Sequence, residues 1–167
     1  MGAENSVTRL NSTFQAGIKS PLDDAILSAH GEGPDGWVRL SEVPFDFERR
    51  CLSVLMARSG ENMLVAKGAP ESILSRCVAV EIDGHAHPLD AAWQRRMADI
   101  QDRYAHDGFR LLAVAVRSIP PGQQTNTVGD EADLTMVGFC VFADPPKRDA
   151  ASAINALASL GVTIKII

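Results

Sequence analysis

Apolar and polar residues alternate along several short stretches of the chain, and this period of two predicts β-strands. Residues 49–58 and 61–67 are such stretches, and the dipeptide Ser-Gly between them predicts a tight hairpin. Alternating or continuous apolar runs predict the remaining strands over residues 37–45, 78–83, 110–118 and 134–143. Along residues 110–118, Arg110 begins the face that continues with apolar side chains at every second position.

A spacing of three or four residues between apolar positions predicts helices elsewhere. The clearest helix covers residues 89–107, where an apolar stripe is followed by a stop at Gly108 and is made of Leu89, Trp93, Met97, Ile100 and Tyr104. Shorter helices are expected over residues 6–18, 20–31 and 70–77. A core role accounts for the stripe, and no function is assigned to it.

This order of elements predicts an α+β fold. Neighbouring strands joined by short turns favour a mostly antiparallel sheet with helices packed against it, over residues 1–143. Residues 144–167 differ, because a double proline leads into an amphipathic helix and then into a strand that is almost entirely apolar. Helix followed by buried strand is half of a parallel βαβ unit. We therefore expect residues 144–167 to be a hinge and the truncated start of a second, Rossmann-like domain.

Composition narrows the function classes. The chain has 167 residues, of which 46% are hydrophobic and 22% charged, which suits an ordinary buried core. A net charge of −5 argues against nucleic-acid binding, which usually requires a basic face. No apolar run approaches the roughly 18 residues of a membrane span, so no direct membrane insertion is expected. The three cysteines lie far apart and are expected to be reduced core residues.

Three short stretches carry candidate chemistry, namely residues 43–50, 66–71 and 107–115, of which two are ends of predicted strands and one is a turn before a strand. They supply phenylalanine rings, Lys67 and Arg110. An aromatic face with nearby cations suits a nucleotide, whose base stacks and whose phosphates need positive charge. Spacing alone does not establish that these stretches converge, and an ordinary strand–turn–helix joint at Lys67 is the alternative.

Other motifs give weaker signals. Neither a G-x-x-x-x-G-K-[ST] phosphate loop nor a G-x-G-x-x-G motif is present. Asp23 and Asp24 can be read as an acid–base pair, but acidic residues at a helix start also complement the helix dipole. His85 and His87 are expected in a turn without a third metal ligand, so no metal site is predicted.

Several longer strings resemble the nucleotide-binding domain of P-type ATPases. The family pattern is KGAPE at 67–71, GFRLLAVA at 108–115 and DPPK at 144–147, with LGVTIKII at the end resembling the segment before a T-G-D motif. Residues 10–27 and 43–56 look most like the bacterial magnesium-importing branch. The resemblance covers about residues 7–167.

The resemblance implies roles for individual residues. Phe47 would stack on adenine, Lys67 would line the deep wall of the adenine pocket, and Arg110 would reach toward the phosphates. Gly68 would let the nucleotide approach the backbone. Arg49 would assist near the ribose or phosphates.

One acidic residue is also implied. Asp23 matches the position of a glutamate in the family pattern P-T-E-x-A-L and would accept a hydrogen bond from the adenine amino group. Asp is one methylene shorter than Glu, so Asp24 is the alternative. Phe47 as a core residue and Arg110 as a surface partner of Asp107 are the plain structural interpretations.

The implied function is ATP binding, as Mg-ATP, within a magnesium-transporting pump at the cytoplasmic face of the bacterial inner membrane. The partners would be the phosphorylation and actuator domains of the same full-length chain. The D-K-T-G-T motif with the phosphorylated aspartate is absent, so the soluble 167-residue chain is expected to bind ATP without forming a phosphoenzyme. A non-catalytic interaction module of the same fold, and a pump for another cation, remain as alternatives.

Overall fold

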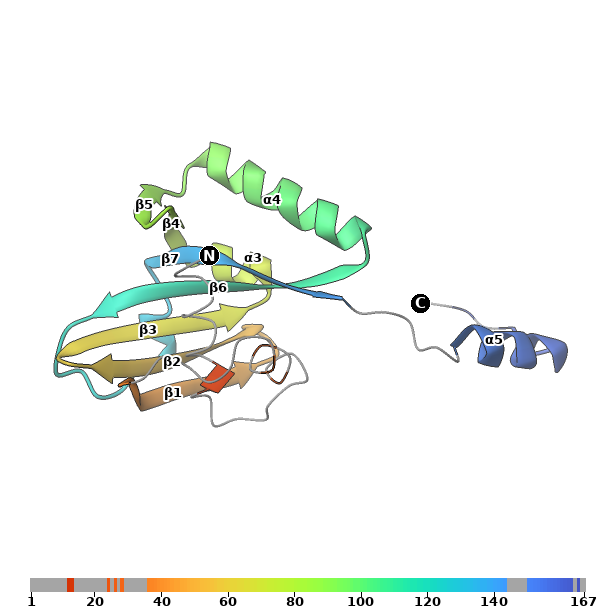
Figure 1. The fold of residues 1–167 in the computed structure, drawn as a ribbon, viewed down its shortest axis with the longest axis horizontal. Helices are drawn as coiled ribbons and strands as arrows, with labels where there is room; N and C mark the ends of the chain where they lie inside the picture. Colours follow the sequence, from red (N-terminus) through yellow and green to blue (C-terminus); the bar gives the residue numbers. More distant parts are fainter. Residues whose placement is uncertain are drawn as a thin grey trace.

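The structure is a computed structural model that describes residues 12–13, 24, 26, 28, 36–143, 150–163 and 165. Its strands are β1 Val38–Asp46, β2 Cys51–Arg58, β3 Glu61–Gly68, β4 Cys77–Ile82, β5 His85–Pro88, β6 Phe109–Ile119 and β7 Leu134–Ala143. They form one sheet in the order β1-β2-β3-β6-β7-β4-β5 (Figure 1). Every neighbouring pair is antiparallel except β4 with β7. The α+β class and the mostly antiparallel sheet are therefore confirmed.

The hairpin of β2 and β3 forms where the sequence predicts it. Its two-residue turn, Ser59 and Gly60, has φ values of 51° and 84°, the left-handed backbone that a tight hairpin requires. The register pairs Arg58 with Glu61 next to this turn and Cys51 with Gly68 at the other end. That other end is where the predicted lysine stretch leaves the sheet.

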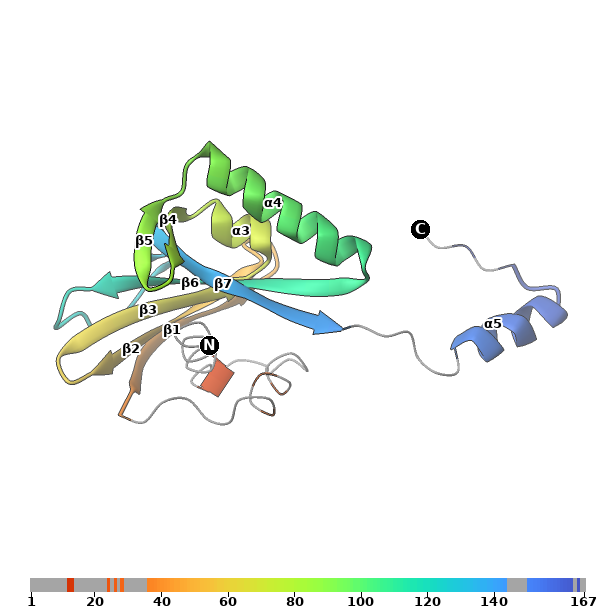
Figure 2. The same ribbon diagram turned by 45° about the horizontal axis from the view of Figure 1, so that its top comes forward.

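Two helices cover one face of the sheet: α3, Pro70–Leu74, and α4, Ala91–His106 (Figure 2). Proline at the first position of α3 suits a helix start, since that residue needs no backbone N–H donor. Asp90 caps α4, because its carboxylate accepts hydrogen bonds from the backbone N–H groups of Ala92 and Trp93 at 2.9 Å. The predicted long helix is confirmed.

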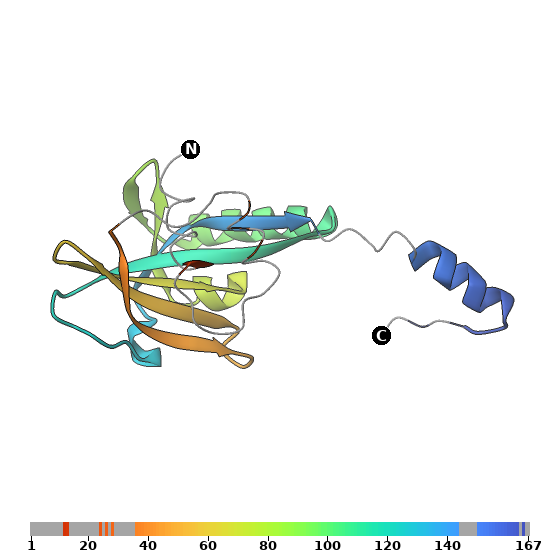
Figure 3. The same cartoon turned by 60° about the horizontal axis from the view of Figure 1, so that its bottom comes forward.

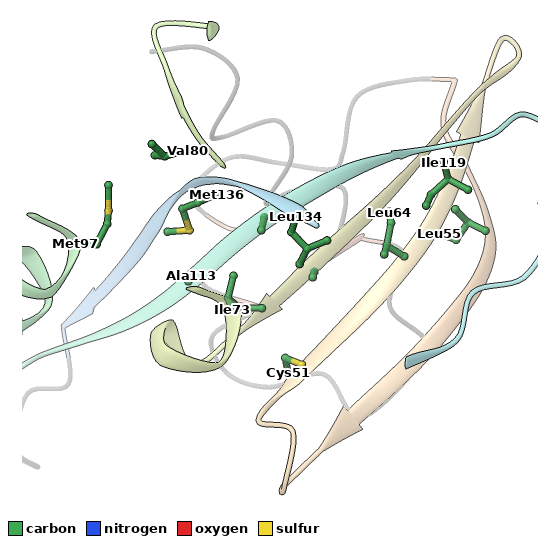
Figure 4. Packing of buried hydrophobic residues seen from close by; sticks show 12 residues of the cluster. Cys51, Leu55, Leu64, Ile73, Val80, Met97, Ala113, Ile119, Leu134 and Met136 are labelled. Carbon is green, nitrogen blue, oxygen red and sulfur yellow. The ribbon is translucent and has the colours of Figure 1, made fainter. Parts of the chain in front are cut away.

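The core divides between the two faces of the sheet, because side chains alternate along each strand. On the face under the helices, Ile73 of α3 and Met97 of α4 join a cluster of strand residues (Figure 4). The strand members labelled with them are Cys51, Leu55, Leu64, Val80, Ala113, Ile119, Leu134 and Met136. Each large apolar side chain removed from water contributes about 1.5–3 kcal/mol.

A second, smaller cluster lies on the opposite face of the sheet. It contains Leu52, Val54, Met56, Val65 and Val114. The residues 12–13 lie on this side, away from α4, as Figures 1 and 2 both show. Figure 3 shows the twist of the sheet with β1 at its edge. This second face carries the lysine of the candidate site.

The chain outside residues 36–143 is described only in part. Residues 12–13, 24, 26 and 28 are helical, in line with the two helices expected there, while the rest of those predicted helices lies outside the described residues. Helix α5, Ala150–Ser159, forms as expected, and its side chains from residue 152 onward are exposed.

Two local predictions were wrong. Val162, Thr163 and Lys165 adopt no strand, although an apolar strand was expected there. A strand needs a neighbour to satisfy its backbone groups, and these residues pair with none. His85 and His87, expected in a turn, lie in strand β5, which pairs with β4 after the turn at Asp83 and Gly84.

Candidate functional site

Lys67 is buried near the end of β3, with only 4% of its surface exposed. It pairs with Leu52 on one neighbouring strand and Val114 on the other, so these three side chains form a row on one face of the sheet. Its Nζ donates a hydrogen bond to the Oγ of Ser12 at 3.0 Å. The structure therefore excludes a solvated strand end as the explanation of this lysine.

Arg110 lies on the same face of the sheet as Lys67. Strand β6 places Arg110 four residues before Val114, the partner of Lys67, and positions separated by an even number point to one face. Since β3 ends at Gly68, opposite Ala113, Arg110 lies beyond the end of β3. Its side chain is exposed. The two cations predicted from separate strands therefore share one face and one end of the sheet.

Phe47 belongs to the turn of residues 47–50 between β1 and β2, and it is 88% exposed. Its ring meets that of Phe45 edge-on, with centroids 5.3 Å apart. The turn is joined to the end of β3 by a hydrogen bond of 2.9 Å from the Ala69 N–H to the Arg50 carbonyl. Phe47 is thus not a core residue, and its turn lies at the end of the sheet where Lys67 and Arg110 are found.

Gly68 lies where strand β2 comes close to the end of β3. A Cβ atom at this position would lie 2.5 Å from the Cβ of Cys51 and would also collide with the Arg50 carbonyl oxygen. Gly68 points to the face opposite that of Lys67, because the two residues are adjacent in a strand. The close approach of β2 gives this glycine a structural reason, and the space for a ligand expected here stays a prediction.

Arg49 has partners within the protein, and its expected role near the ribose or phosphates stays a prediction. Its Nη1 donates to both carboxylate oxygens of Glu131, at 2.6 and 2.8 Å, and its Nη2 donates to the Pro44 carbonyl at 2.7 Å. Glu131 in turn accepts a hydrogen bond from Ser53, on the helix-covered side of the sheet. Arg49 is therefore bound within the protein and does not lie on the face of Lys67.

Glu131 was not identified from the sequence. It stands in the polar string GDEAD, where its acidic neighbours give no sign that this one carboxylate is buried. The structure shows its side chain 0% exposed and within 4.0 Å of Arg76 as well as Arg49. Breaking a buried ion pair by removing one partner typically costs about 3–5 kcal/mol, so this group is expected to matter for stability.

Two of the three cysteines, Cys51 and Cys77, have environments that suppress their reactivity. Burial raises the pKa of Cys77 to about 12. Burial also raises the pKa of Cys51, and the adjacent Glu131 charge adds to the effect while Arg76 and Arg49 oppose it. A thiol is nucleophilic only as the thiolate, so neither residue suits nucleophilic catalysis.

The predicted adenine-binding aspartate cannot be placed. Asp23 lies outside the described residues, while Asp24 is helical and exposed. Neither contact with a base is therefore tested by the structure, and both remain expectations.

A groove of about 430 Å³ lies between α4 and strands β4 and β7, on the face of the sheet that the helices cover. Mostly apolar residues line it, together with the charged residues Glu81, Arg96 and Arg103. This groove lies on the face opposite Lys67 and contains none of the residues predicted to bind a nucleotide.

Within the part of the chain that the structure describes, no helix is long and apolar enough to cross a bilayer. Among the same residues, no group of three or more His, Cys, Asp or Glu side chains is placed to hold a metal ion.

Comparison with known proteins identifies close relatives. The magnesium-transporting ATPase, P-type 1, of Escherichia coli (strain K12) is 38% identical over 164 residues, which is 95% of this chain and 18% of that protein. The protein of the same name in Salmonella typhimurium (strain 14028s / SGSC 2262) is 39% identical over the same shares. The endoplasmic reticulum-type calcium-transporting ATPase 3 of Arabidopsis thaliana is 32% identical over 127 residues, 75% of this chain and 13% of that protein.

These shares also show the extent of the chain, which spans 18% or less of the length of the three relatives. The sequence profile of the family described as P-type ATPase, cytoplasmic domain N, matches residues 15–149. That match covers most of the chain and the whole seven-stranded sheet. The chain therefore belongs to the P-type ATPase family, as its cytoplasmic N domain.

Proposed function

We propose that this chain binds ATP for a magnesium-transporting P-type ATPase, with adenine at Phe47 and Lys67 and the phosphates toward Arg110. The observation that carries the proposal is the position of Lys67, buried on the same sheet face as Arg110 and at the end of the sheet where Phe47 is exposed. Three chain segments that are distant in sequence thus supply a ring and two cations to one region.

The physical properties of these side chains suit a nucleotide. The exposed ring of Phe47 makes few contacts within the protein, so a base can stack on it. Such base–aromatic stacking is worth roughly 1–3 kcal/mol in nucleic-acid binders. A buried ammonium group has lost hydration and gains from hydrogen-bond acceptors on a ligand. An exposed arginine can approach phosphate oxygens with two parallel hydrogen bonds.

The role of such a domain within a longer protein is positioning. ATP held by its base would be brought by domain closure to the aspartate of a phosphorylation domain, which would accept the γ-phosphate. We assign residues 1–143 to the nucleotide domain and residues 144–167 to a hinge and the start of the phosphorylation domain. Helix α5 and the residue after it expose apolar side chains, Ile154, Leu157 and Leu160, that the phosphorylation domain would cover.

The remaining partners and the location follow from the same proposal. An actuator domain and the phosphorylation domain of the same protein would be its partners, Mg-ATP its substrate, and the cytoplasmic face of the bacterial inner membrane its site of action. Magnesium as the transported ion rests on the relatives at 38% and 39% identity, against 32% for the calcium-transporting relative. Ion choice itself would be made by the membrane helices of the full-length pump.

Calorimetry of the 167-residue chain with Mg-ATP tests the proposal. We expect saturable heat in the millimolar range and no release of inorganic phosphate, because the D-K-T-G-T motif is absent. A chain that gives no heat at millimolar ATP would instead be a non-catalytic interaction module of the same fold.

A further inference from the structure

The turn that carries Phe47 is held from a distant part of the chain. Arg49 in this turn and Glu131 are 82 residues apart in sequence, and Nη1 of Arg49 donates to both oxygens of the Glu131 carboxylate, at 2.8 and 2.6 Å. The Arg49 side chain is 16% exposed and that of Glu131 is 0% exposed. The contact is therefore a largely desolvated ion pair and differs in kind from a surface pair between mobile side chains.

Arg49 connects this ion pair to the backbone on both sides of the turn. Its Nη2 donates to the Pro44 carbonyl in β1, and its backbone N–H donates to Oδ1 of Asp46, both at 2.7 Å. The Arg50 N–H donates to the Asp46 carbonyl at 2.7 Å. One side chain thus links the end of β1, the turn and a buried carboxylate.

Glu131 is itself firmly placed. Ser53 of β2 donates to its Oε1 at 2.8 Å, and Asn126 donates to Ser53 at 3.0 Å. The short helix before it, Val128–Asp130, closes through a capping box in which Asp130 accepts from the Thr127 N–H and hydroxyl. These hydrogen bonds lower the pKa of Asp130, so its carboxylate is ionised in this role.

The loop is tied to the sheet a second time on the other side of Glu131. Arg117 of β6 donates to the carbonyls of Asp130 and Ala132, at 3.2 and 3.1 Å. Backbone carbonyls on both sides of Glu131 are therefore fixed to a central strand. The carboxylate is presented to Arg49 from a rigid support.

Phe47, by contrast, gains little position from packing. Its ring is 88% exposed and touches Phe45, which is itself 49% exposed. The backbone of the turn must therefore set where the ring lies. Contacts that fix the backbone of this turn therefore also fix the position of the Phe47 ring.

We infer that Glu131 is a positioning residue for the nucleotide site, because it holds Arg49 and, through Arg49, the turn that presents Phe47. This inference rests on the proposed function for its effect on ATP, but the hold on the turn is a separate, measurable property. Buried polar pairs can serve to fix one conformation and need not add net stability.

The test compares two variants of the 167-residue chain, Glu131→Gln and Ser53→Ala. The first keeps the shape of the side chain and removes its charge. The second removes a different hydrogen bond to the same carboxylate and leaves Arg49 paired. Amide hydrogen exchange by NMR reports on Arg49 and Arg50, with Val65 and Val114 of the central strands as references, and Mg-ATP titration reports affinity.

We expect Glu131→Gln to speed exchange at Arg49 and Arg50 roughly tenfold more than at the reference amides, as for a lost hydrogen bond to a charged group. It should also weaken Mg-ATP binding, with Ser53→Ala affecting neither measurement selectively. Equal effects of the two variants, or acceleration at Arg49 and Arg50 no greater than at the reference amides, would overturn the inference, since either result would indicate a change in general stability alone.

Two further outcomes separate the inference from the proposed function. Selective acceleration in the turn with unchanged ATP affinity would overturn the positioning role. If the unmodified chain binds no ATP, the proposed function fails together with the positioning role at that site. The exchange data would still show whether Glu131 holds the turn.

Discussion

Cys51 and Gly68 pair directly across strands β2 and β3, and a Cβ atom placed on Gly68 would lie 2.5 Å from the Cβ of Cys51. The obstacle is the body of a neighbouring strand and not the flexible end of a side chain. The glycine therefore allows β2 and β3 to pair closely at the position next to Lys67.

Replacement of Gly68 by alanine should lower the free energy of unfolding by roughly 1–3 kcal/mol, the usual cost of overpacking. Gly129→Ala is the matched control, because a Cβ there meets its nearest neighbour, the Thr127 Oγ1, at an ordinary 3.5 Å. Urea denaturation measures both. Equal stability of the two variants would show that β2 shifts at little cost and that close strand pairing does not explain the glycine at position 68.

Phe47→Ala should weaken Mg-ATP binding by about tenfold, since a base stacked on an aromatic ring is worth roughly 1–3 kcal/mol. Stability should hardly change, because the ring is 88% exposed. Phe45→Ala is the comparison, as the two rings are in contact. Titration calorimetry gives the affinities, and a larger loss in Phe45→Ala would move the stacking role from Phe47 to Phe45.

Lys67→Met keeps most of the side chain and removes the charge. A lost hydrogen bond to a charged group is worth about 1.5–3 kcal/mol, so ATP affinity should fall roughly tenfold to a hundredfold. Stability should not fall in parallel, because a buried ammonium group is costly to desolvate. Arg58→Met, at the far end of β2, is the control for loss of a cation. Unchanged affinity in Lys67→Met would remove this lysine from the site.

Alkylation of Cys77 should be slow and should keep rising with pH. Its pKa of about 12 leaves the thiol protonated at pH 8.5, so its reaction with iodoacetamide should be roughly a thousandfold slower than in the unfolded chain. In the folded protein the rate should still increase between pH 8 and 10. A plateau near pH 9, measured by mass spectrometry of the Cys77 peptide, would mean that burial does not raise this pKa.

Much of the fold could be predicted from local patterns. The β2–β3 hairpin and helix α4 are specified by alternation, a Ser-Gly turn and an apolar stripe, which act over a few residues. Strand β5 was missed because its four residues, His85–Pro88, are all exposed and carry no apolar alternation. The terminal strand was predicted from apolar composition, which cannot supply the neighbouring strand that it needs.

In the candidate site, too, some residues could be predicted from local patterns, while the contacts of others depend on the fold. Lys67 and Arg110 stand at strand ends, and the strand register brings them to one face. The contacts of Arg49 could not be predicted because its partner, Glu131, is 82 residues away and is brought close only by the fold. The close strand pairing at Gly68 could not be predicted because a strand-ending glycine looks the same whether a nucleotide or a neighbouring backbone comes close.

The proposed nucleotide site is most directly tested by NMR titration of the 167-residue chain with Mg-ATP. We predict that the signals of Phe47, Lys67 and Arg110 shift together and saturate at one ATP concentration. Shifts confined to other surfaces, such as the groove beside α4, or no shifts at millimolar ATP, would contradict the site.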